Sequence, residues 1–293
     1  MSRSTTALLL AIGSTAFFSM MHALVRYLSG EMDPLEIAFL RSVFGVVALA
    51  PLLLRVGWRG FAVTRPLALG IRGTLSGLSM MLWFSGLALV PIAEATALSF
   101  TNTIFATLGA VIVLGEPMRA RRWTAVVVGM IGVLVVLRPG IGVVQVGSLL
   151  VLCSALIWGS VMCLVKELVK TETPAAVTLW TAVAVAVMTA IPAAFVWRTP
   201  SWTEIALLAV MGVLGSVGQL MWTQAIKSVD ATLIIPTDFT RLVWAGLIGY
   251  LAFAEVPDLW TWVGSALIVG STLYIGLREA HLGRQRDRVK DGA

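Results

Sequence analysis

The chain has 293 residues, of which 58% are hydrophobic and only 12% are charged, and its net charge is +6. Soluble domains carry about 25% charged residues, so this composition excludes an ordinary water-soluble protein, which could not bury so much apolar surface. The basic residues are scattered between apolar runs and do not gather on a polar face, which argues against a nucleic-acid partner. Composition thus predicts a protein whose solvent is the lipid bilayer.

Long apolar runs follow one another along the whole chain. A helix that crosses a bilayer needs about 20 mostly apolar residues. Ten such runs are found, at 5–27, 35–54, 66–89, 91–114, 121–138, 145–166, 174–197, 202–225, 231–253 and 258–277. Because the linkers are short, we predict an all-α integral membrane protein of ten transmembrane helices with no separate soluble domain.

The positive charges predict the orientation of these helices. With the N-terminus inside, only Arg26, Arg138 and Arg198 of the 21 Lys and Arg residues fall in outer linkers, and most of the others fall in inner linkers and at the termini. The positive-inside rule therefore predicts a multi-pass protein of a bacterial-type inner membrane with both termini in the cytoplasm.

The two halves of the chain resemble each other. Residues 8–28 align with 148–168, and a constant offset of 139 pairs landmark residues further on, namely Trp83/Trp222, Phe100/Phe239, Glu116/Glu255 and Trp123/Trp262. Chance matches between apolar segments rarely pair Trp and Glu at one spacing, so the similarity indicates an internal repeat. Five is an odd number of helices, so the second repeat must enter the membrane from the opposite side, as in many secondary transporters.

This repeat divides the chain into three predicted parts. The first five-helix repeat covers residues 1–140 and the second, inverted repeat covers 141–280, while 281–293 form a basic cytoplasmic tail. In transporters built from inverted repeats, the substrate site lies near the bilayer midplane between the repeats, and alternating access comes from rocking one repeat against the other. We expect the same arrangement here.

No motif of an enzyme or of a metal site is found. The patterns G-x-x-x-x-G-K-[ST], H-E-x-x-H and G-x-S-x-G are all absent, so neither ATP hydrolysis nor a hydrolase is indicated. Cys153 and Cys163 lie ten residues apart in one apolar run, which is about 15 Å on a helix and too far for a disulfide. The chain is therefore predicted to be no enzyme and to need no metal or cofactor.

Several motifs resemble the EamA-type branch of the drug/metabolite transporter superfamily. They are "PLEIAFLRSVFG", "AEATALSF", "LGEP" at Leu114–Pro117 and its echo "AEVP" at Ala254–Pro257, together with the basic ends of the helices Ala16–Tyr27 and Ile157–Leu168. The resemblance extends over essentially the whole chain and implies a secondary transporter, somewhat similar to the YddG-type amino-acid exporters. The chain departs from many relatives in having Asn102-Thr103 where they carry a proline in the fourth helix.

The predicted function is transport of a small polar or amphipathic metabolite, with export of amino acids as the first expectation. The alternative is uptake or exchange of a nucleotide-like or vitamin cofactor, of the riboflavin or S-adenosylmethionine type, or drug efflux. A receptor or assembly subunit without transport activity is a further, weaker alternative, and coupling to protons is left open. Since only Arg241 lies deep in a span, substrates with an extended phosphate are disfavoured.

The strongest candidate for the binding site is Arg241, in the middle of the ninth predicted span. An ion at this depth costs about 2.5–3.5 kcal/mol on insertion scales, so it needs a polar neighbour or water. Asp238 precedes Arg241 by one helical turn, and the pair is either a self-neutralising clamp or a contact for a zwitterionic or anionic substrate in a cavity. The repeat favours the cavity slightly, because the equivalents of Asp238 and Arg241 are the polar Ser99 and Asn102.

Two further groups of residues are candidates for substrate contact. His22 and Trp158 lie in equivalent helices of the two repeats, and His22 is either hydrogen-bonded to a neighbour or a proton-sensitive contact. Trp83 and Trp222, with Gln219, form either an aromatic wall for the substrate or ordinary packing and interface anchors.

The remaining landmarks have structural interpretations. Arg41 and Arg72 lie about six residues inside their helices and are predicted to reach an interface with their long side chains. Gly73 and Gly77 have the small-xxx-small spacing that lets two helices approach closely. Glu255 and its equivalent in the first repeat are predicted to cap the helices that follow them.

Overall fold

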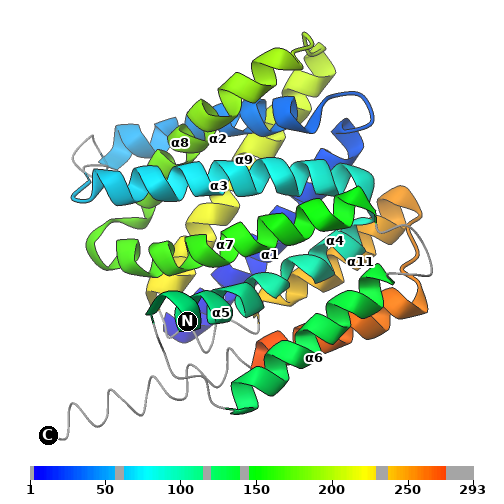
Figure 1. Ribbon diagram of the computed structural model, residues 1–293. Coiled ribbons are helices and arrows are strands. Elements are labelled where there is room, and N and C mark those ends of the chain that lie inside the picture. Colours follow the sequence, from blue (N-terminus) through cyan, green and yellow to red (C-terminus); the bar gives the residue numbers. More distant parts are fainter. Residues whose placement is uncertain (1–2, 57–62, 115–119, 139–144, 229–236, 275–293) are drawn as a thin grey trace, which may run out of the picture.

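A computed structural model of the chain describes residues 3–56, 63–114, 120–138, 145–228 and 237–274, and every regular element in these ranges is a helix. The elements are α1 (Arg3–Leu28), α2 (Pro34–Val56), α3 (Pro66–Leu89), α4 (Ile92–Ser99), α5 (Thr101–Leu114), α6 (Ala120–Leu137), α7 (Val146–Thr171), α8 (Pro174–Phe195), α9 (Trp202–Ser228), α11 (Thr240–Phe253) and a last helix, Leu259–Tyr274. The all-α prediction is confirmed, and each predicted span overlaps a described helix (Figure 1).

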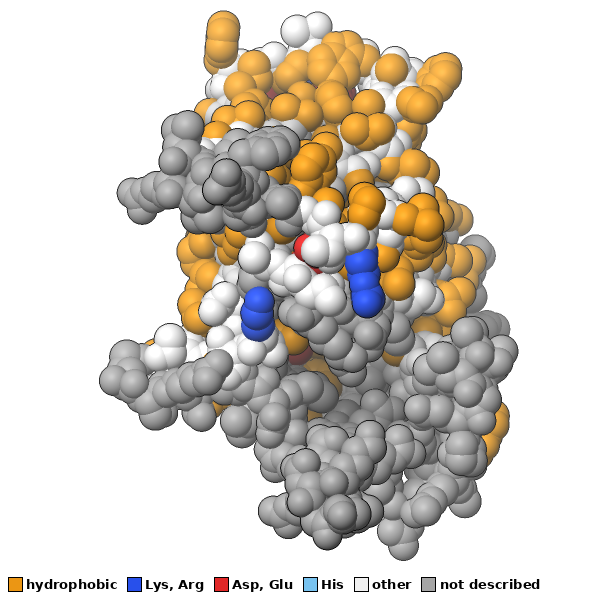
Figure 2. Space-filling model, turned by 90° about the vertical axis from the view of Figure 1, so that its left-hand side faces the viewer, with side chains coloured by type: hydrophobic (Ala, Val, Ile, Leu, Met, Phe, Trp, Pro, Cys, Tyr) orange, Lys and Arg blue, Asp and Glu red, His pale blue; other side chains and the backbone are white. Residues whose placement is uncertain are grey.

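Large apolar side chains cover much of the outside of the bundle, in addition to those in its core. By length and composition, five of the helices described are able to cross a membrane. Leu67, Phe195 and Trp202 are 77%, 86% and 85% exposed, whereas Ser14 and Thr15 are wholly buried. Figure 2 shows hydrophobic side chains over much of the described surface, with few charged ones between them. Apolar side chains outside and hydroxyls inside are the arrangement that hydrocarbon selects, because it cannot hydrogen-bond to a polar group.

The longest contacts between the two halves of the chain include an antiparallel pair of helices, α3 and α7. α3 packs along α7, and α1 along α9. Gly86, near the end of α3, would overlap Gly147 at the start of α7 if it had a side chain, while Thr64, just before α3, hydrogen-bonds to Glu172 at the end of α7. α1 and α3 are parallel to each other, since Arg26 at the end of α1 donates to the carbonyl of Leu87 at the end of α3. α1 and α7 therefore run in opposite directions.

Glycines allow the closest contacts between helices. A Cβ on Gly73 of α3 would overlap the side chain of Ala184 in α8, and one on Gly77 would lie 3.1 Å from the side chain of Met188. The interpretation of these two glycines as packing residues is confirmed. α6 and the last helix, Leu259–Tyr274, meet through Gly132 and Gly264 at the periphery of the bundle (Figure 1).

The fourth predicted span is not one continuous helix. Residues 91–114 are divided at Phe100 into α4 and α5, because the Phe100 amide bonds to the carbonyl of Ala97, three residues back, and not four. Phe239, the repeat equivalent of Phe100, stands immediately before α11 and its ring centroid is 4.9 Å from that of Phe100. The two halves thus break a helix at the same position and touch there. In the second half, the sequence also predicts a helix break at Pro236, which lies outside the described residues.

Glu255 caps a different helix from the one predicted. Its carboxylate accepts from the amide of Ile92 at 2.9 Å, at the start of α4, and pairs with Arg26 at 3.4 Å. The last helix is capped by Asp258 instead, which accepts from the Thr261 amide. The prediction assumed that Glu255 caps the next helix along the chain, whereas the fold brings its carboxylate to the N-terminus of α4. Glu116 lies outside the described residues.

A carboxylate also joins the two halves at the opposite end of the bundle. Glu172, just after α7, accepts from the amide and the hydroxyl of Thr64, at 2.8 and 2.6 Å, and from the amide of Arg65 at 3.0 Å. Burial acts to raise the pKa of Glu172, but these donors and the charge of Arg65 outweigh it and lower the pKa below its usual range.

The glycine contact between α3 and α8 can be tested with a matched pair of substitutions on one helix. Gly73→Ala should lower the melting temperature in detergent, by an amount corresponding to about 1–3 kcal/mol of overpacking. Gly70→Ala should leave it unchanged or slightly higher, because nothing lies within 4 Å of a Cβ at Gly70. Equal melting temperatures for the two variants would contradict the proposed close approach.

The Glu172 contact predicts a pH dependence. A carboxylate whose pKa is lower in the folded than in the unfolded protein stabilises the fold above its unfolded pKa, and the gain is lost as pH falls through the folded value. Glu172→Gln should therefore melt below the wild type at pH 7, and the difference should shrink at acid pH as Glu172 is protonated. A difference that is constant from pH 7 to the acid end would show that charge at Glu172 is unimportant.

Candidate functional site

A cavity of about 180 Å³ lies between the two halves of the chain. This far exceeds the space of about 10–15 Å³ that one water needs. Each half contributes corresponding segments to the wall. The first half gives residues of α1, α2, α3 and the α4–α5 break, and the second gives residues of α7, α8, α9 and α11. Among the residues whose side chains are described, neither α6 nor the last helix contributes to the lining. The cavity therefore lies between corresponding segments of the two halves of the chain.

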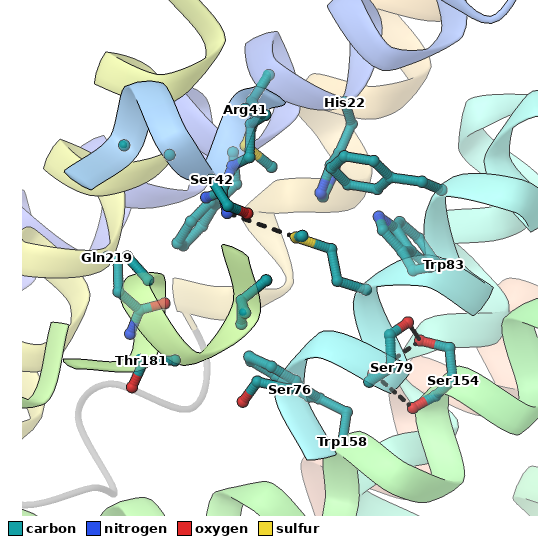
Figure 3. Close-up of a pocket in the computed structure, with 18 of the residues that line it drawn as sticks. His22, Arg41, Ser42, Ser76, Ser79, Trp83, Ser154, Trp158, Thr181 and Gln219 are labelled. Atoms are coloured by element: carbon teal, nitrogen blue, oxygen red, sulfur yellow. Dashed lines mark hydrogen bonds between the residues drawn. The ribbon is translucent and has the colours of Figure 1, made fainter. Parts of the chain in front are cut away.

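Aromatic rings form one side of the cavity (Figure 3). The ring of His22, on α1, meets the indole of Trp83, on α3, edge to face with centroids 5.1 Å apart. Trp158 of α7 lines the same space, and next to it Ser79 and Ser154 exchange hydrogen bonds that tie α3 to α7, with their hydroxyls 2.9 Å apart. These flat, amphipathic rings suit a solute that is partly aromatic.

Two guanidinium groups face the cavity. Arg241 pairs with Asp238 at 3.2 Å and its Cζ lies 5.3 Å from the ring centre of Phe100. Arg41 has no acidic partner among the described residues, and its hydrogen bond goes to the thioether of Met80 at 3.4 Å. The prediction that Arg41 reaches an interface is wrong, because α2 turns this side chain into the cavity.

Arg72 does not reach an interface either. It is 1% exposed, and a single hydrogen bond at 3.4 Å joins it to the carbonyl of Val177 in α8. Arg72 does not line the cavity. Its surroundings are those of a side chain that packs two helices together.

Unpaired polar atoms gather around the cavity. Ten buried side-chain nitrogen or oxygen atoms of the described residues lack a hydrogen-bond partner within the protein, and half of them belong to lining residues: Arg41 Nε, Ser76 Oγ, Trp83 Nε1, Thr178 Oγ1 and Arg241 Nε. An unpaired buried donor costs about 1–3 kcal/mol, so such atoms need water or a bound solute. These unpaired atoms indicate that water or a solute with polar groups occupies the cavity.

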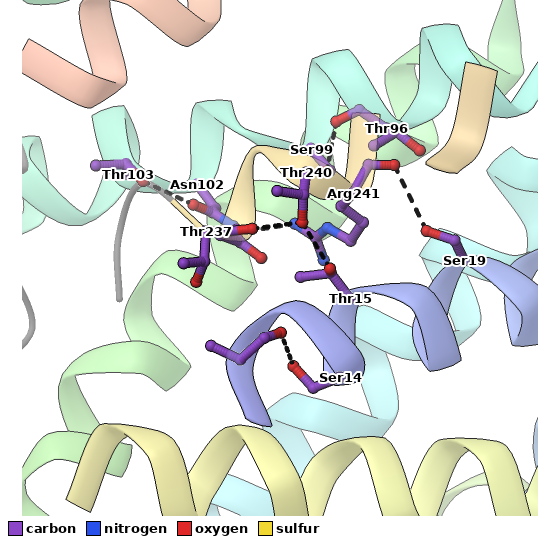
Figure 4. A network of polar contacts seen from close by, with 12 residues as sticks. Ser14, Thr15, Ser19, Thr96, Ser99, Asn102, Thr103, Thr237, Thr240 and Arg241 are labelled. Carbon is purple, nitrogen blue, oxygen red and sulfur yellow. Dashed lines mark hydrogen bonds and ion pairs between the residues drawn. The ribbon is translucent and has the colours of Figure 1, made fainter. Parts of the chain in front are cut away.

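Most of the residues predicted for the site come together in this cavity. The lining includes His22, Trp83, Ser99, Asn102, Trp158, Gln219 and Arg241. Figure 4 shows Ser99 and Asn102 beside Arg241 on the broken helices. Asp238 does not line the wall and contacts Arg241 from outside it. Trp222 does not line it either, because it lies nearly one turn beyond Gln219 and packs against Ala7, Ala11 and Ala225.

The lining residues from α2 and α8 were not predicted from the sequence. Arg41, Ser42 and Thr178 line the cavity, as does Thr181. Arg41 could have been found, since it is a charged residue within a predicted span, but its distance from the helix start suggested an interface. The serines and threonines gave no signal, because single hydroxyls are common throughout membrane helices, where they bond to the carbonyl one turn back, as Thr181 does to Val177.

Apolar helices around a cavity lined by aromatic rings, hydroxyls and two guanidinium groups, in a chain without ATP-binding or hydrolase motifs, are the features of a membrane transport protein. The model of the EamA-like transporter family matches residues 5–138 and again residues 145–277. The chain belongs to this family, within the drug/metabolite transporter superfamily. It is a membrane transporter and not an enzyme.

Curated relatives are similar over most of their length. The S-adenosylmethionine uptake transporter of Rickettsia bellii is 30% identical over 85% of this chain and 86% of its own. The riboflavin transporter of Rhizobium johnstonii is 30% identical over 97% and 95%, and the pseudopaline exporter of Pseudomonas aeruginosa is 30% identical over 90% and 93%. One crystal structure superposes with a TM-score of 0.64 at 21% identity, covering 96% of this chain and 99% of the other, which shows a shared fold.

Proposed function

We propose that this protein carries a nucleotide-like or vitamin cofactor, a small amphipathic solute with a flat heterocyclic ring, across a bacterial inner membrane. The observation that carries the proposal is the combination of aromatic rings and unpaired donors in one cavity. His22, Trp83 and Trp158 offer ring faces and edges, while Trp83 Nε1 and Ser76 Oγ offer unused hydrogen bonds.

The relatives favour this substrate class over amino acids. S-adenosylmethionine and riboflavin both join a heterocycle to a polar chain, and none of the three relatives named above is an amino-acid exporter by name. Export of amino acids, the first expectation from the sequence, is therefore the weaker candidate. The nucleotide-like or vitamin cofactor becomes the preferred solute.

The proposal includes a ten-helix architecture of two inverted repeats, 1–140 and 141–280, with both termini in the cytoplasm. The double match of the family model supports it. So do the helix contacts: if α1 corresponds to α7 and α3 to α9, the packing of α1 on α9 becomes the packing of α7 on α3, and both are found. The excess of Lys and Arg in linkers on the N-terminal side supports the orientation.

In this proposal, transport occurs by alternating access around the shared cavity. At the end of the molecule where α1 ends, the ion pair between Arg26 and Glu255 joins the two halves. The backbone amide of Arg198 also donates to Glu36 across the halves, and the side chain of Arg198 pairs with Glu204. Opening the cavity on this side, which the charge pattern makes the periplasmic side, would separate Arg26 from Glu255. The described conformation then corresponds to a carrier closed toward the periplasm.

The proposed substrate contacts are the seven predicted residues of the wall. Asp238 acts as the charge partner that holds Arg241, and Trp222 is assigned to packing. Coupling to protons is not part of the proposal, although His22 faces the cavity.

Counterflow in proteoliposomes tests the proposed solute class. Vesicles loaded with unlabelled S-adenosylmethionine or riboflavin should accumulate the same labelled compound at least several-fold above protein-free vesicles, because a carrier exchanges its substrate. Vesicles loaded with leucine or tryptophan should not accumulate their labelled counterparts. Counterflow with amino acids alone would contradict the proposal.

A second prediction concerns Arg241. Arg241→Ala should reduce the transport rate about tenfold or more, since a hydrogen bond to a charged group contributes about 1.5–3 kcal/mol, while the variant still elutes as a folded monodisperse protein. Arg72→Ala is the control, because Arg72 is equally charged but does not line the cavity. It should lower the folded yield, and the fraction that folds should transport. Undiminished transport by well-folded Arg241→Ala would remove Arg241 from the site.

A further inference from the structure

We infer that Arg41 is the anion-binding group of the cavity, so that the transported solute carries a carboxylate on a short chain beside its ring. This inference rests on the proposed function and narrows its substrate class. Among heterocyclic cofactors, it selects molecules that end in an amino-acid or other carboxylate group over neutral ones.

The charge of Arg41 is the uncompensated charge of the described cavity wall. The lining contains Arg41 and Arg241 but no Asp or Glu among the described residues. Arg241 already has Asp238 at 3.2 Å, whereas Arg41 has a weak sulfur acceptor at 3.4 Å and an Nε without any partner. A guanidinium has five N–H donors and is always charged, so a solute anion would supply what the protein does not.

The guanidinium of Arg41 occupies space that a glycine of α9 leaves open. It lies over Gly215 of α9, where a Cβ would overlap Nη2 and lie 2.8 Å from Cζ. One residue further on, the hydroxyl of Ser216 donates to the carbonyl of Gly45 at 3.0 Å and fixes α9 against α2. The glycine at this position leaves room for the guanidinium against α9, at the wall of the cavity.

The anion and the ring would bind to the same wall. Met80, which accepts from Arg41, lies one helical turn before Trp83 on α3, so both side chains share a face of that helix. Trp83 in turn meets His22 at 5.1 Å. Figure 3 shows Arg41, His22 and Trp83 around the same space. A solute with a ring on Trp83 and a short chain toward Arg41 would use both features.

A carboxylate fits this group better than a phosphate does. A carboxylate can accept two parallel hydrogen bonds from one guanidinium, and its single negative charge balances the single positive charge of Arg41. A phosphate would bring about two negative charges at neutral pH. The other guanidinium of the described wall, Arg241, is already neutralised by Asp238. A solute that is only cationic would be repelled.

The test compares two probes that differ by one group. S-adenosylmethionine and its decarboxylated form share the ring, the sulfonium and the amine, and only the first has a carboxylate. Purified wild-type protein should bind S-adenosylmethionine at least tenfold more tightly. Arg41→Met should abolish this preference, and Arg41→Lys, which keeps the charge but not the two parallel donors, should retain part of it.

Gly215→Ala tests the same group with the arginine still present. The added methyl should push the guanidinium out of its place and reduce the preference for the carboxylate, while the melting temperature shows that the protein is folded. Gly246→Ala is the matched control, because a Cβ there meets nothing within 4 Å. Its preference should equal that of the wild type.

The outcomes separate the two proposals. If riboflavin, which is neutral, is bound and transported while the carboxylate gives no advantage, or if Arg41→Met keeps the full preference, the role of Arg41 is overturned and the proposed function stands. If neither cofactor binds, the proposed function fails, and the anion site is then tested by the melting temperature of the protein with indole-3-acetate or indole-3-ethanol. An increase with indole-3-acetate alone, which is lost in Arg41→Met, would support the anion site. The same melting temperature with both compounds would overturn it.

Discussion

The structure depends on one constraint, which is that a polar group in hydrocarbon must find a partner inside the protein. Lipid offers neither a hydrogen bond nor a counter-ion, so the hydroxyls and guanidiniums of these helices turn inward while Phe195 and Trp202 face outward. Pairing within the protein satisfies most of the inward groups, such as Ser79 and Ser154. Half of the ten atoms left without a partner among the described residues belong to the lining of one cavity, and there a solute would supply the missing contacts.

Both halves of the chain, each matched by the family model, contribute to the cavity wall. α6 and the last helix supply none of the described lining residues and meet through Gly132 and Gly264. The broken helices meet through Phe100 and Phe239, at positions related by the repeat. A break at this point ends one run of backbone hydrogen bonds and starts another beside the cavity, a common feature of transporter sites.

Composition and periodicity predicted the helical class and the approximate spans, because the need to cover about 30 Å of hydrocarbon dictates long apolar runs. The deep position of Arg241 and the repeat equivalence with Asn102 identified part of the wall. The role of Arg41 and the break at Phe100 were not predicted. Both depend on how helices rotate and pack against each other, for example on Gly215 facing Arg41, and no local pattern in one sequence encodes such a pairing.

The carboxylate of Glu255 serves three segments at once. It follows α11, holds the side chain of Arg26 from α1, and receives the first amide of α4. These contacts share one pair of oxygens, so a displacement of Glu255 disrupts both bonds together and leaves a cation and a helix end exposed in the same event. Separation of the three segments at this end of the molecule is therefore cooperative. A state in which only one of the two contacts is broken is less favourable than a state in which both are intact or both are broken.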